Sequence, residues 1–368
     1  MTKKRFTALL LAIFMVAITM SAGCRGLSNK PAKTDMLLLF TDEESGLYGF
    51  MDADCNIVIP AKFVHSGTGH FNVGYFIGEY AIVGVMESSN RGIINKQGEW
   101  VINPAYSGVI NPISDGLMRY EDPISHKTGY MDLEGYWAIE PRFLRAYDFN
   151  QGMAVVRDYE LFRSGIIDTS GRWIAEPKYH YLQDFHEGLA YAEEEKGDLA
   201  GYIDTSGNWV IQPQFDPNAF DIAHMFSEGL AAAVVDLGNG VYKKGYIHKD
   251  GSWAFTLENS GDLHCYPFTE GLARVQNGTT GKYGFINTKG NWVIPAKFAR
   301  AEAFSEGLAV AADDAVGLKG YINKNGEWEI EPQFEAAFAF EKGFALVRLI
   351  GDDVYATIDT KGNVLRPR

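Results

Sequence analysis

Histidines and carboxylates are the residues of this 368-residue chain best suited to chemistry, and their spacing argues against a metal centre. Zinc sites usually combine His and Cys ligands at short, fixed spacings. His180 and His186 lie six residues apart with no Cys between them, which is only a weak signal. We therefore predict surface or turn histidines, no metal and no cofactor. The eight histidines are at positions 65, 70, 126, 180, 186, 224, 248 and 264.

The carboxylates give no clearer sign of a reaction. Acidic pairs at 313–314 and 352–353 lack the alternating ligands, Gly and terminal Glu of a calcium loop, so we expect solvated loop charges. A glycosidase needs two carboxyl groups with different roles in one cleft. Four glutamates instead recur at one position of a repeated motif, which favours turn-stabilising or solvated roles and no catalytic residue. They are Glu187, Glu228, Glu270 and Glu306.

Three insertions interrupt the repeats and are the candidate sites for a localised function. The Gly-rich stretch at 65–78 has no Lys-Ser/Thr after its glycines and opens no evident helix, so a phosphate loop is not expected. The stretches at 216–225 and 236–245 are the other two, and the copy that follows has Leu257 and Asn259 where others have Pro and an aromatic residue. Drift in surface loops is the competing interpretation.

A repeat of about 36 residues positions all of these groups. Its first Gly recurs eight times, and Ala356 fills the same slot in a ninth, incomplete copy. A second Gly follows six residues later, and an Asp or Asn usually lies between the two. The first glycines are Gly49, Gly92, Gly129, Gly165, Gly201, Gly245, Gly284 and Gly320.

A Trp stands eight residues after the first Gly in seven copies, and these are all the tryptophans of the chain. Ile57 and Val364 occupy this slot in the end copies, which preserves burial but not ring stacking. We therefore favour packing between repeats over an exposed carbohydrate-stacking ladder. The tryptophans are Trp100, Trp137, Trp173, Trp209, Trp253, Trp292 and Trp328.

The pattern predicts β-hairpins. Segments such as "GYID" and "WVI" alternate in polarity, and "TSGN" between them suits a loop with Gly at positive φ, capped by the Asp. A Pro after the second segment is expected to end the ladder, and an aromatic residue follows it. The motif "F-x-E-G-L-A" then opens a third strand, which gives nine strand triplets between residues 36 and 368.

This combination of Gly, Trp, Pro and "EGLA" resembles the bacterial WG-repeat family over nearly all of residues 36–368. The resemblance implies an all-β protein of eight to nine repeated units, on exported or surface proteins, without a catalytic site. Units of this length suit a β-propeller-like ring, which we slightly prefer to an open β-solenoid or superhelical array.

The first 24 residues are different in character. Positive residues at 3–5 precede an apolar run at 6–20 that is short for a membrane span, and "SAGC" ends at Cys24. The stretch resembles a bacterial lipoprotein signal, although Ser21 stands where that family prefers Leu. This implies a signal peptide at 1–23, a lipidated (palmitate-bearing) Cys24 with a flexible tether to residue 35, and a repeat domain at 36–368. Ordinary secretory cleavage and an uncleaved anchor are the alternatives.

The net charge limits the kinds of partner that we expect, and two cysteines remain to be assigned. The net charge is −14 and no basic stripe follows residue 34, so nucleic acid is not an expected partner. Cys55 and Cys265 lie in distant repeats, and we expect two unpaired, partly buried thiols. We predict a non-catalytic protein anchored by lipid on the extracytoplasmic side of the membrane, which binds an unknown protein or envelope glycan. A propeller-type hydrolase and a structural spacer are the alternatives, and the oligomeric state stays open.

Overall fold

The computed structural model describes residues 36–64, 76–85, 91–106, 110–217, 224–239, 241–257, 263–313, 317–352 and 354–367. These residues form β-strands and turns, and none of them lies in a helix, so the predicted all-β class is confirmed. In particular, none of the described segments is a helix with the length and apolar character that a membrane crossing requires. The predicted signal peptide and tether at 1–35 lie outside the described residues.

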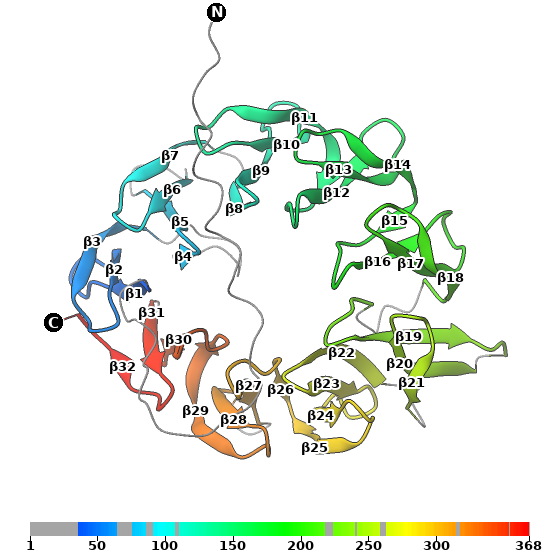
Figure 1. Cartoon of the computed structure of the whole chain (residues 1–368). Coiled ribbons are helices and arrows are strands. Elements are labelled where there is room, and N and C mark those ends of the chain that lie inside the picture. Colours follow the sequence, from blue (N-terminus) through cyan, green and yellow to red (C-terminus); the bar gives the residue numbers. More distant parts are fainter. Residues whose placement is uncertain are drawn as a thin grey trace, which may run out of the picture. The chain divides into compact units, whose positions relative to one another are not determined.

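Every sheet is antiparallel, and strands adjacent in the sequence are adjacent in the sheet (Figure 1). We number the strand sets as units 1 to 9. Unit 1 consists of β1 (Leu38–Thr41), β2 (Tyr48–Met51) and β3 (Ile57–Phe63), and unit 2 of β4 (Phe76–Ile77), β5 (Tyr80–Gly84), β6 (Arg91–Asn95) and β7 (Trp100–Tyr106). Unit 3 consists of β8 (Ile110–Ser114), β9 (Leu117–Glu121), β10 (Thr128–Met131) and β11 (Trp137–Ala146), and unit 4 of β12 (Met153–Asp158), β13 (Ser164–Asp168) and β14 (Trp173–Tyr179).

The second half of the chain continues the same pattern. Units 3 and 4 share one sheet through β11 and β12, and units 8 and 9 share one through β29 and β30. Unit 5 consists of β15 (Tyr181–Leu182), β16 (Leu189–Glu193), β17 (Ala200–Asp204) and β18 (Trp209–Phe215), and unit 6 of β19 (Leu230–Asp236), β20 (Tyr242–His248) and β21 (Trp253–Thr256). Unit 7 consists of β22 (Leu263–Thr269), β23 (Leu272–Asn277), β24 (Tyr283–Asn287) and β25 (Trp292–Phe298). Units 8 and 9 are β26 (Arg300–Ala301), β27 (Leu308–Ala312), β28 (Lys319–Asn323), β29 (Trp328–Ala337); and β30 (Phe344–Leu349), β31 (Tyr355–Asp359), β32 (Val364–Leu365).

The Trp-bearing strands continue through their prolines, so the prediction that Pro ends the ladder is wrong. In unit 5, Ala200 pairs with Phe215 but Tyr202 pairs with Ile211, which is a bulge around Pro213. Gly201 makes this bulge possible, because a Cβ there would lie 2.3 Å from the Ile211 carbonyl oxygen. The first Gly of the repeat therefore permits close approach of the bulged strand.

The second Gly and the preceding Asp shape the hairpin loop as predicted. Gly207 has φ of 81° and its N–H donates to the Asp204 carbonyl oxygen at 2.9 Å. The Asp204 carboxylate accepts the N–H groups of Ser206 and Asn208, each at 2.9 Å. The side chain thus satisfies backbone donors that the turn leaves without strand partners.

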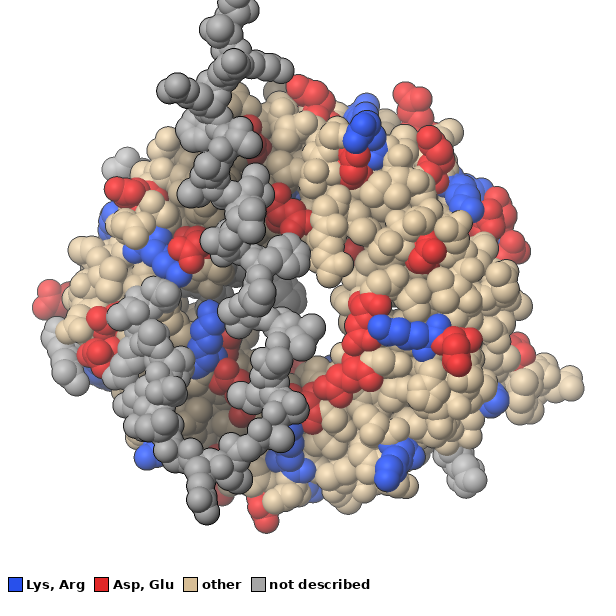
Figure 2. Space-filling model, viewed as in Figure 1, with Lys and Arg blue, Asp and Glu red and all other residues tan. Residues whose placement is uncertain are grey.

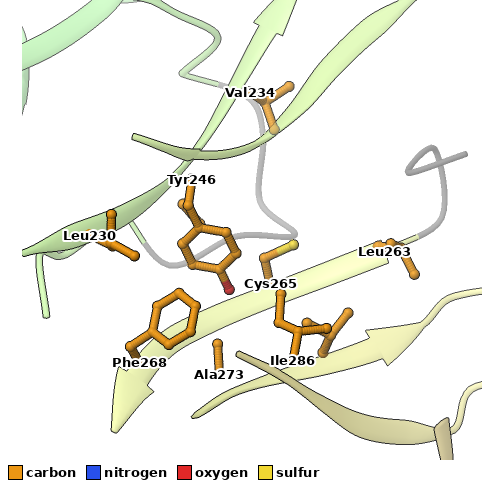
Figure 3. Packing of buried hydrophobic residues seen from close by; sticks show 10 residues of the cluster. Leu230, Val234, Tyr246, Leu263, Cys265, Phe268, Ala273 and Ile286 are labelled. Atoms are coloured by element: carbon orange, nitrogen blue, oxygen red, sulfur yellow. The ribbon is translucent and has the colours of Figure 1, made fainter. Parts of the chain in front are cut away.

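The core lies between consecutive units. Figure 3 shows Leu230 and Tyr246 of unit 6 packed against Cys265 and Phe268 of unit 7. The Tyr246 hydroxyl also donates to the Tyr266 carbonyl oxygen at 2.7 Å. Each unit therefore buries its apolar face only with the help of its neighbour, as expected for a repeat protein. Cys265 is buried, Cys55 is half-buried, and the two do not form a disulfide.

The first unit also packs against the last one. β1 and β31 are in contact, as Figure 1 shows. The Thr357 hydroxyl donates to the Leu39 carbonyl oxygen at 2.8 Å, and the Thr41 hydroxyl donates to the Tyr355 carbonyl oxygen at 3.1 Å. Leu39 and Leu346 share a buried cluster. These contacts join the first unit to the last, as a propeller-like arrangement of the units requires.

Candidate functional site

The described His, Cys, Asp and Glu side chains are not arranged as a metal site. In the part of the chain that the structure describes, no three His, Cys, Asp or Glu side chains are grouped as a metal site would need. His224 is buried, with its ring stacked on Tyr191 at a centroid distance of 3.9 Å, so the prediction of a surface or turn position is wrong for this residue. His126 and His248 lie exposed in or beside turns. His65 and His70, with most of the predicted Gly-rich insertion, lie outside the described residues.

The recurring glutamates bind the turn of the next unit. Glu187 and Gly188 are the two positive-φ residues of a tight hairpin turn, a conformation that costs free energy for a non-glycine residue. The Glu187 carboxylate accepts the Gly229 N–H at 3.1 Å. Gly229 lies in the equivalent turn of unit 6. This is the turn-stabilising role, but the stabilised turn belongs to the neighbour. The further pairs are Glu228 with Gly271, Glu270 with Gly307, Glu306 with Gly343, and Asp115 with Gly152.

Two lysines reinforce this series of carboxylates. Lys249 of unit 6 bonds both the carboxylate and the carbonyl oxygen of Glu187, each at 2.9 Å. Partial burial would raise the pKa of Glu187, but Lys249 and the turn N–H groups outweigh it and hold the pKa below its usual value. Lys324 does the same for Glu270, whose pKa is also lowered. These ionised carboxylates are structural links, which does not suit a proton-transfer role.

The Trp slot packs against both its own repeat and the preceding one. A Cβ on Gly92 would lie 2.5 Å from Cζ3 of Trp100, so the indole covers the first Gly of its own repeat. Trp100 also meets Phe63 of the preceding unit edge to face, with ring centroids 5.9 Å apart. The same inter-unit pairs are Phe143 with Trp173, Tyr179 with Trp209, and Phe298 with Trp328.

The tryptophans are not fully buried. Trp137, Trp173, Trp209, Trp253 and Trp328 are half-buried, whereas Trp100 and Trp292 are 37% and 43% exposed. Trp137 lies beside Tyr120, and the Lys243 ammonium lies 4.3 Å from the Trp253 ring centroid. These contacts hold the indole rings against side chains of their own or the preceding repeat.

A departure from the repeat appears at the hairpins that join the "EGLA" strand to the "GYID" strand. In units 3 to 6 these hairpin tips carry exposed apolar side chains, which we call the apolar arc. Ile124 is 89% exposed, Leu161 60%, Phe162 56% and Leu237 62%. The members of the apolar arc are Ile124, Tyr159, Leu161, Phe162, Leu199, Leu237, Val241 and Tyr242.

Direct contacts place three of these tips side by side. The Lys127 ammonium of the unit 3 tip lies 4.2 Å from the Tyr159 ring centroid of unit 4. Arg163 of the unit 4 tip forms an ion pair with Glu195 of the unit 5 tip at 2.6 Å. The tip of unit 6 comes next, and its β19–β20 hairpin extends outward at the right-hand edge of Figure 1. These contacts thus join the tips of units 3 to 5, and the tip of unit 6 follows them in the order of the units.

The backbone of the unit 4 tip is held in a defined shape. The Asp158 carboxylate accepts the N–H groups of Glu160 and Leu161 at 2.9 and 2.8 Å. Phe162 has φ of 54°, so its backbone adopts a left-handed conformation that large side chains rarely take. The neighbouring Arg163 anchors the tip to unit 5. Exposed apolar side chains on an ordered tip are available for contact without first paying the entropy of ordering the loop.

The tips of units 1 and 7 do not share this character. The corresponding tips of units 1 and 7 are polar, with the sequences "DEES" at 42–45 and "NGTTGK" at 277–282. Unit 9 exposes Ile350 alone, and most of the unit 2 and unit 8 tips are outside the described residues. Of the predicted insertions, 236–245 contributes Leu237, Val241 and Tyr242 to the arc. Much of 216–225, and Asn259 of the degenerate copy, lie outside the described residues.

Sequence reasoning missed the rest of the arc. Leu161, Phe162 and Ile124 lie in repeats of ordinary length, so the search for insertions passed over them. The available signal was an apolar residue at a position between two predicted strands where other repeats carry Gly, Ser, Thr or acidic residues. Such a residue gains nothing from the core, which points to a role at the surface.

Comparison with known proteins places the repeats in a described family. A family model for a WG containing repeat matches seven segments that together make up more than half of the chain. No curated protein matches the chain. The segments are residues 92–121, 129–160, 165–196, 201–236, 245–282, 283–314 and 320–351.

Some solved structures are similar at low identity. Hsv2 from Kluyveromyces lactis is 12% identical with a TM-score of 0.37, and the similarity covers 57% of this chain and 71% of that one. A catalytically inactive virginiamycin B lyase from Staphylococcus aureus is 11% identical with a TM-score of 0.32, covering 88% and 94%.

Proposed function

The chain belongs to the family of WG containing repeats, and on that premise we propose that it is a non-catalytic binding module that holds a protein partner at the apolar arc. The observation that carries the proposal is the row of exposed apolar tips on four consecutive units of an otherwise regular scaffold. Contiguous exposed apolar surface on a folded protein commonly marks an interaction site. Repeat scaffolds present such surfaces across several units.

The composition of the arc favours a protein over an envelope glycan. Sugar binding relies on flat aromatic faces and on polar groups that bond hydroxyls, whereas Leu161, Leu199 and Leu237 are aliphatic. Aliphatic side chains next to Tyr159 and Phe162 are what the centre of a protein–protein interface contains. Four tryptophans, Trp100, Trp173, Trp209 and Trp328, contact an aromatic ring of the preceding unit, which supports a scaffold role for them rather than a glycan site.

The proposal that the protein is not an enzyme is supported by how its repeated carboxylates are used. Glu187, Glu228, Glu270 and Glu306 each accept a backbone N–H of the next unit. A hydrolase would instead need unlike polar groups that converge at one place. We propose that the scaffold carries the partner and performs no reaction on it.

The location is a further part of the proposal. The export signal with Cys24 at its end supports a lipid-anchored protein on the extracytoplasmic side of the membrane. The test is incorporation of radiolabelled palmitate into wild type and Cys24→Ser. Lipidation at Cys24 requires that the label disappear in the variant, and equal labelling would reject it.

The binding function is tested by site-specific photo-cross-linking in cells. A benzoyl-phenylalanine replaces Leu161 in one strain and Glu44, on the polar tip of unit 1, in another. We expect a discrete cross-linked protein from position 161 only, saturable by added soluble 25–368 fragment. The Leu161→Ser/Phe162→Ser fragment should not compete, although its thermal unfolding matches wild type within a few degrees. Equal cross-linking from both positions, or equal competition by both fragments, would refute the proposal.

A sedimentation assay separates the glycan alternative. The soluble 25–368 fragment is mixed with purified peptidoglycan and spun down. We expect the fragment to stay in the supernatant. Co-sedimentation that is unchanged by the Leu161→Ser/Phe162→Ser substitutions would favour a glycan surface elsewhere on the repeats.

A further inference from the structure

We propose that the partner segment that occupies the apolar arc is basic, an amphipathic protein segment with Lys or Arg beside its apolar residues. This inference rests on the proposed binding function and adds the charge of the partner to it. It follows from how the charged residues of the arc are used.

The cations around the arc are mostly engaged within the protein. Lys127 covers the Tyr159 ring, and Arg163 binds Glu195. Lys243 lies over the Trp253 ring, and Lys244 is buried with its ammonium bonded to the Leu263 carbonyl oxygen at 2.7 Å. Only Lys196 has an exposed ammonium-bearing side chain without such an engagement among the described tip residues.

The carboxylates around the arc are more numerous and more available. Glu160, Glu194 and Asp198 are exposed on the tips of units 4 and 5, and none takes part in an ion pair within the described structure. Glu160 directly precedes Leu161 and Phe162, and Asp198 directly precedes Leu199. Each of these tips therefore presents a carboxylate immediately beside an apolar side chain.

This pattern contrasts with other charged parts of the surface. Acidic and basic side chains lie next to one another at several places on the face seen in Figure 2. Elsewhere in the repeats, Lys249 pairs with Glu187 and Lys324 pairs with Glu270. At the tips of units 4 and 5 the balance is negative. Charge complementarity across an interface steers encounter and disfavours partners of like sign.

The same balance argues against a membrane as the occupant. Apolar loop tips can insert into a lipid interface, but binding to anionic lipid is driven by Lys and Arg close to the inserted residues. Here Glu160, Glu194 and Asp198 would face the lipid headgroups. A basic and apolar protein segment is the occupant that fits both the apolar side chains and the carboxylates.

Binding of designed peptides to the soluble 25–368 fragment tests the inference by fluorescence anisotropy. The probes are an 18-residue amphipathic peptide of Leu and Lys, its counterpart of Leu and Glu, and a Ser and Lys peptide of equal charge. We expect the Leu/Lys peptide to bind at least tenfold more tightly than either of the others. Leu161→Ser/Phe162→Ser should weaken that binding at least tenfold.

Charge variants identify the carboxylates involved. Glu160→Gln/Glu194→Gln/Asp198→Asn should weaken Leu/Lys binding at least threefold and reduce its dependence on salt. The matched control removes three exposed carboxylates away from the arc, as Glu44→Gln/Glu134→Gln/Glu176→Gln, and should leave binding unchanged.

The outcomes distinguish this inference from the proposed function. Equal binding of the Leu/Glu peptide, or equal effects of the two charge variants, would overturn the basic partner and leave the arc as a protein-binding surface. Binding to phosphatidylglycerol vesicles that depends on Leu161 and Phe162 would overturn it in favour of a membrane. Failure of the cross-linking from position 161 would instead remove the binding function itself.

Discussion

Alanine substitutions at two glycines with the same backbone conformation distinguish two contributions to the free energy of unfolding. One is the strain of a positive φ, and the other is steric crowding between units. Gly188 and Gly207 have φ of 86° and 81°. A Cβ on Gly188 would meet no atom within 4 Å, whereas a Cβ on Gly207 would lie 2.7 Å from the Ala175 Cβ of the preceding unit. The substitutions Gly188→Ala and Gly207→Ala therefore share the backbone strain and differ in packing.

The magnitudes follow from these environments. An alanine forced into the left-handed region costs about 1–2 kcal/mol, which is the whole expected effect of Gly188→Ala. Gly207→Ala adds an overpacking cost of about 1–3 kcal/mol at the boundary between units 4 and 5. We therefore expect Gly207→Ala to lower the free energy of unfolding by about 2 kcal/mol more than Gly188→Ala.

Urea unfolding of the soluble 25–368 fragment, followed by circular dichroism, measures both effects. A double-mutant cycle then tests the cause, because Ala175→Gly removes the atom that the new Cβ would strike. Gly207→Ala should cost less in the Ala175→Gly background, with a coupling of about 1 kcal/mol or more. If both glycine variants were equally destabilised, or if the cycle showed no coupling, the role assigned to this Gly in packing between units would be wrong.

The Trp slot and the carboxylate links give further expectations. Trp328→Ala removes the edge contact with Phe298 and should lower the free energy of unfolding by about 3 kcal/mol, whereas Trp328→Leu should cost roughly half as much, as measured in urea. Because the pKa of Glu270 is lower in the folded state, its contribution to stability is present above its unfolded pKa of about 4.3 and is lost as the pH falls through the folded value. Glu270→Gln should therefore reduce stability by about 1 kcal/mol near neutral pH and flatten the loss between about pH 5 and pH 3; parallel pH curves for variant and wild type would contradict the link to Lys324.

The local structure of each repeat was predictable because it depends on residues close in the sequence. Asp204, Gly207 and Trp209 define a hairpin whose bonds span four residues or fewer. The repetition also predicted nine strand triplets. The proline was misjudged, because its place in a bulge depends on Gly201 of the neighbouring strand, which removes the steric conflict that would otherwise end the pairing.

The contacts between units could not be predicted from the sequence pattern of a single repeat. The bond from Gly229 to Glu187 joins residues 42 positions apart, and nothing in a single repeat shows that the carboxylate reaches its neighbour. The apolar arc depends on a similar fact. Ile124, Leu161 and Leu199 are far apart in the sequence, and they contribute to a common surface only because the fold sets their three hairpins next to one another.

The bulged prolines have a consequence for how many copies of the protein can coexist. β3, β7, β14, β18 and β25 each form the end of a sheet, so the molecule presents a series of open strand edges. Such edges invite pairing with other chains, and the result is aggregation. Pro60, Pro104, Pro177, Pro213 and Pro295 deprive these edges of an N–H donor and bend them at the bulge. The same residue that shapes each repeat thus makes its outer strand a poorer template for pairing with a strand of another molecule.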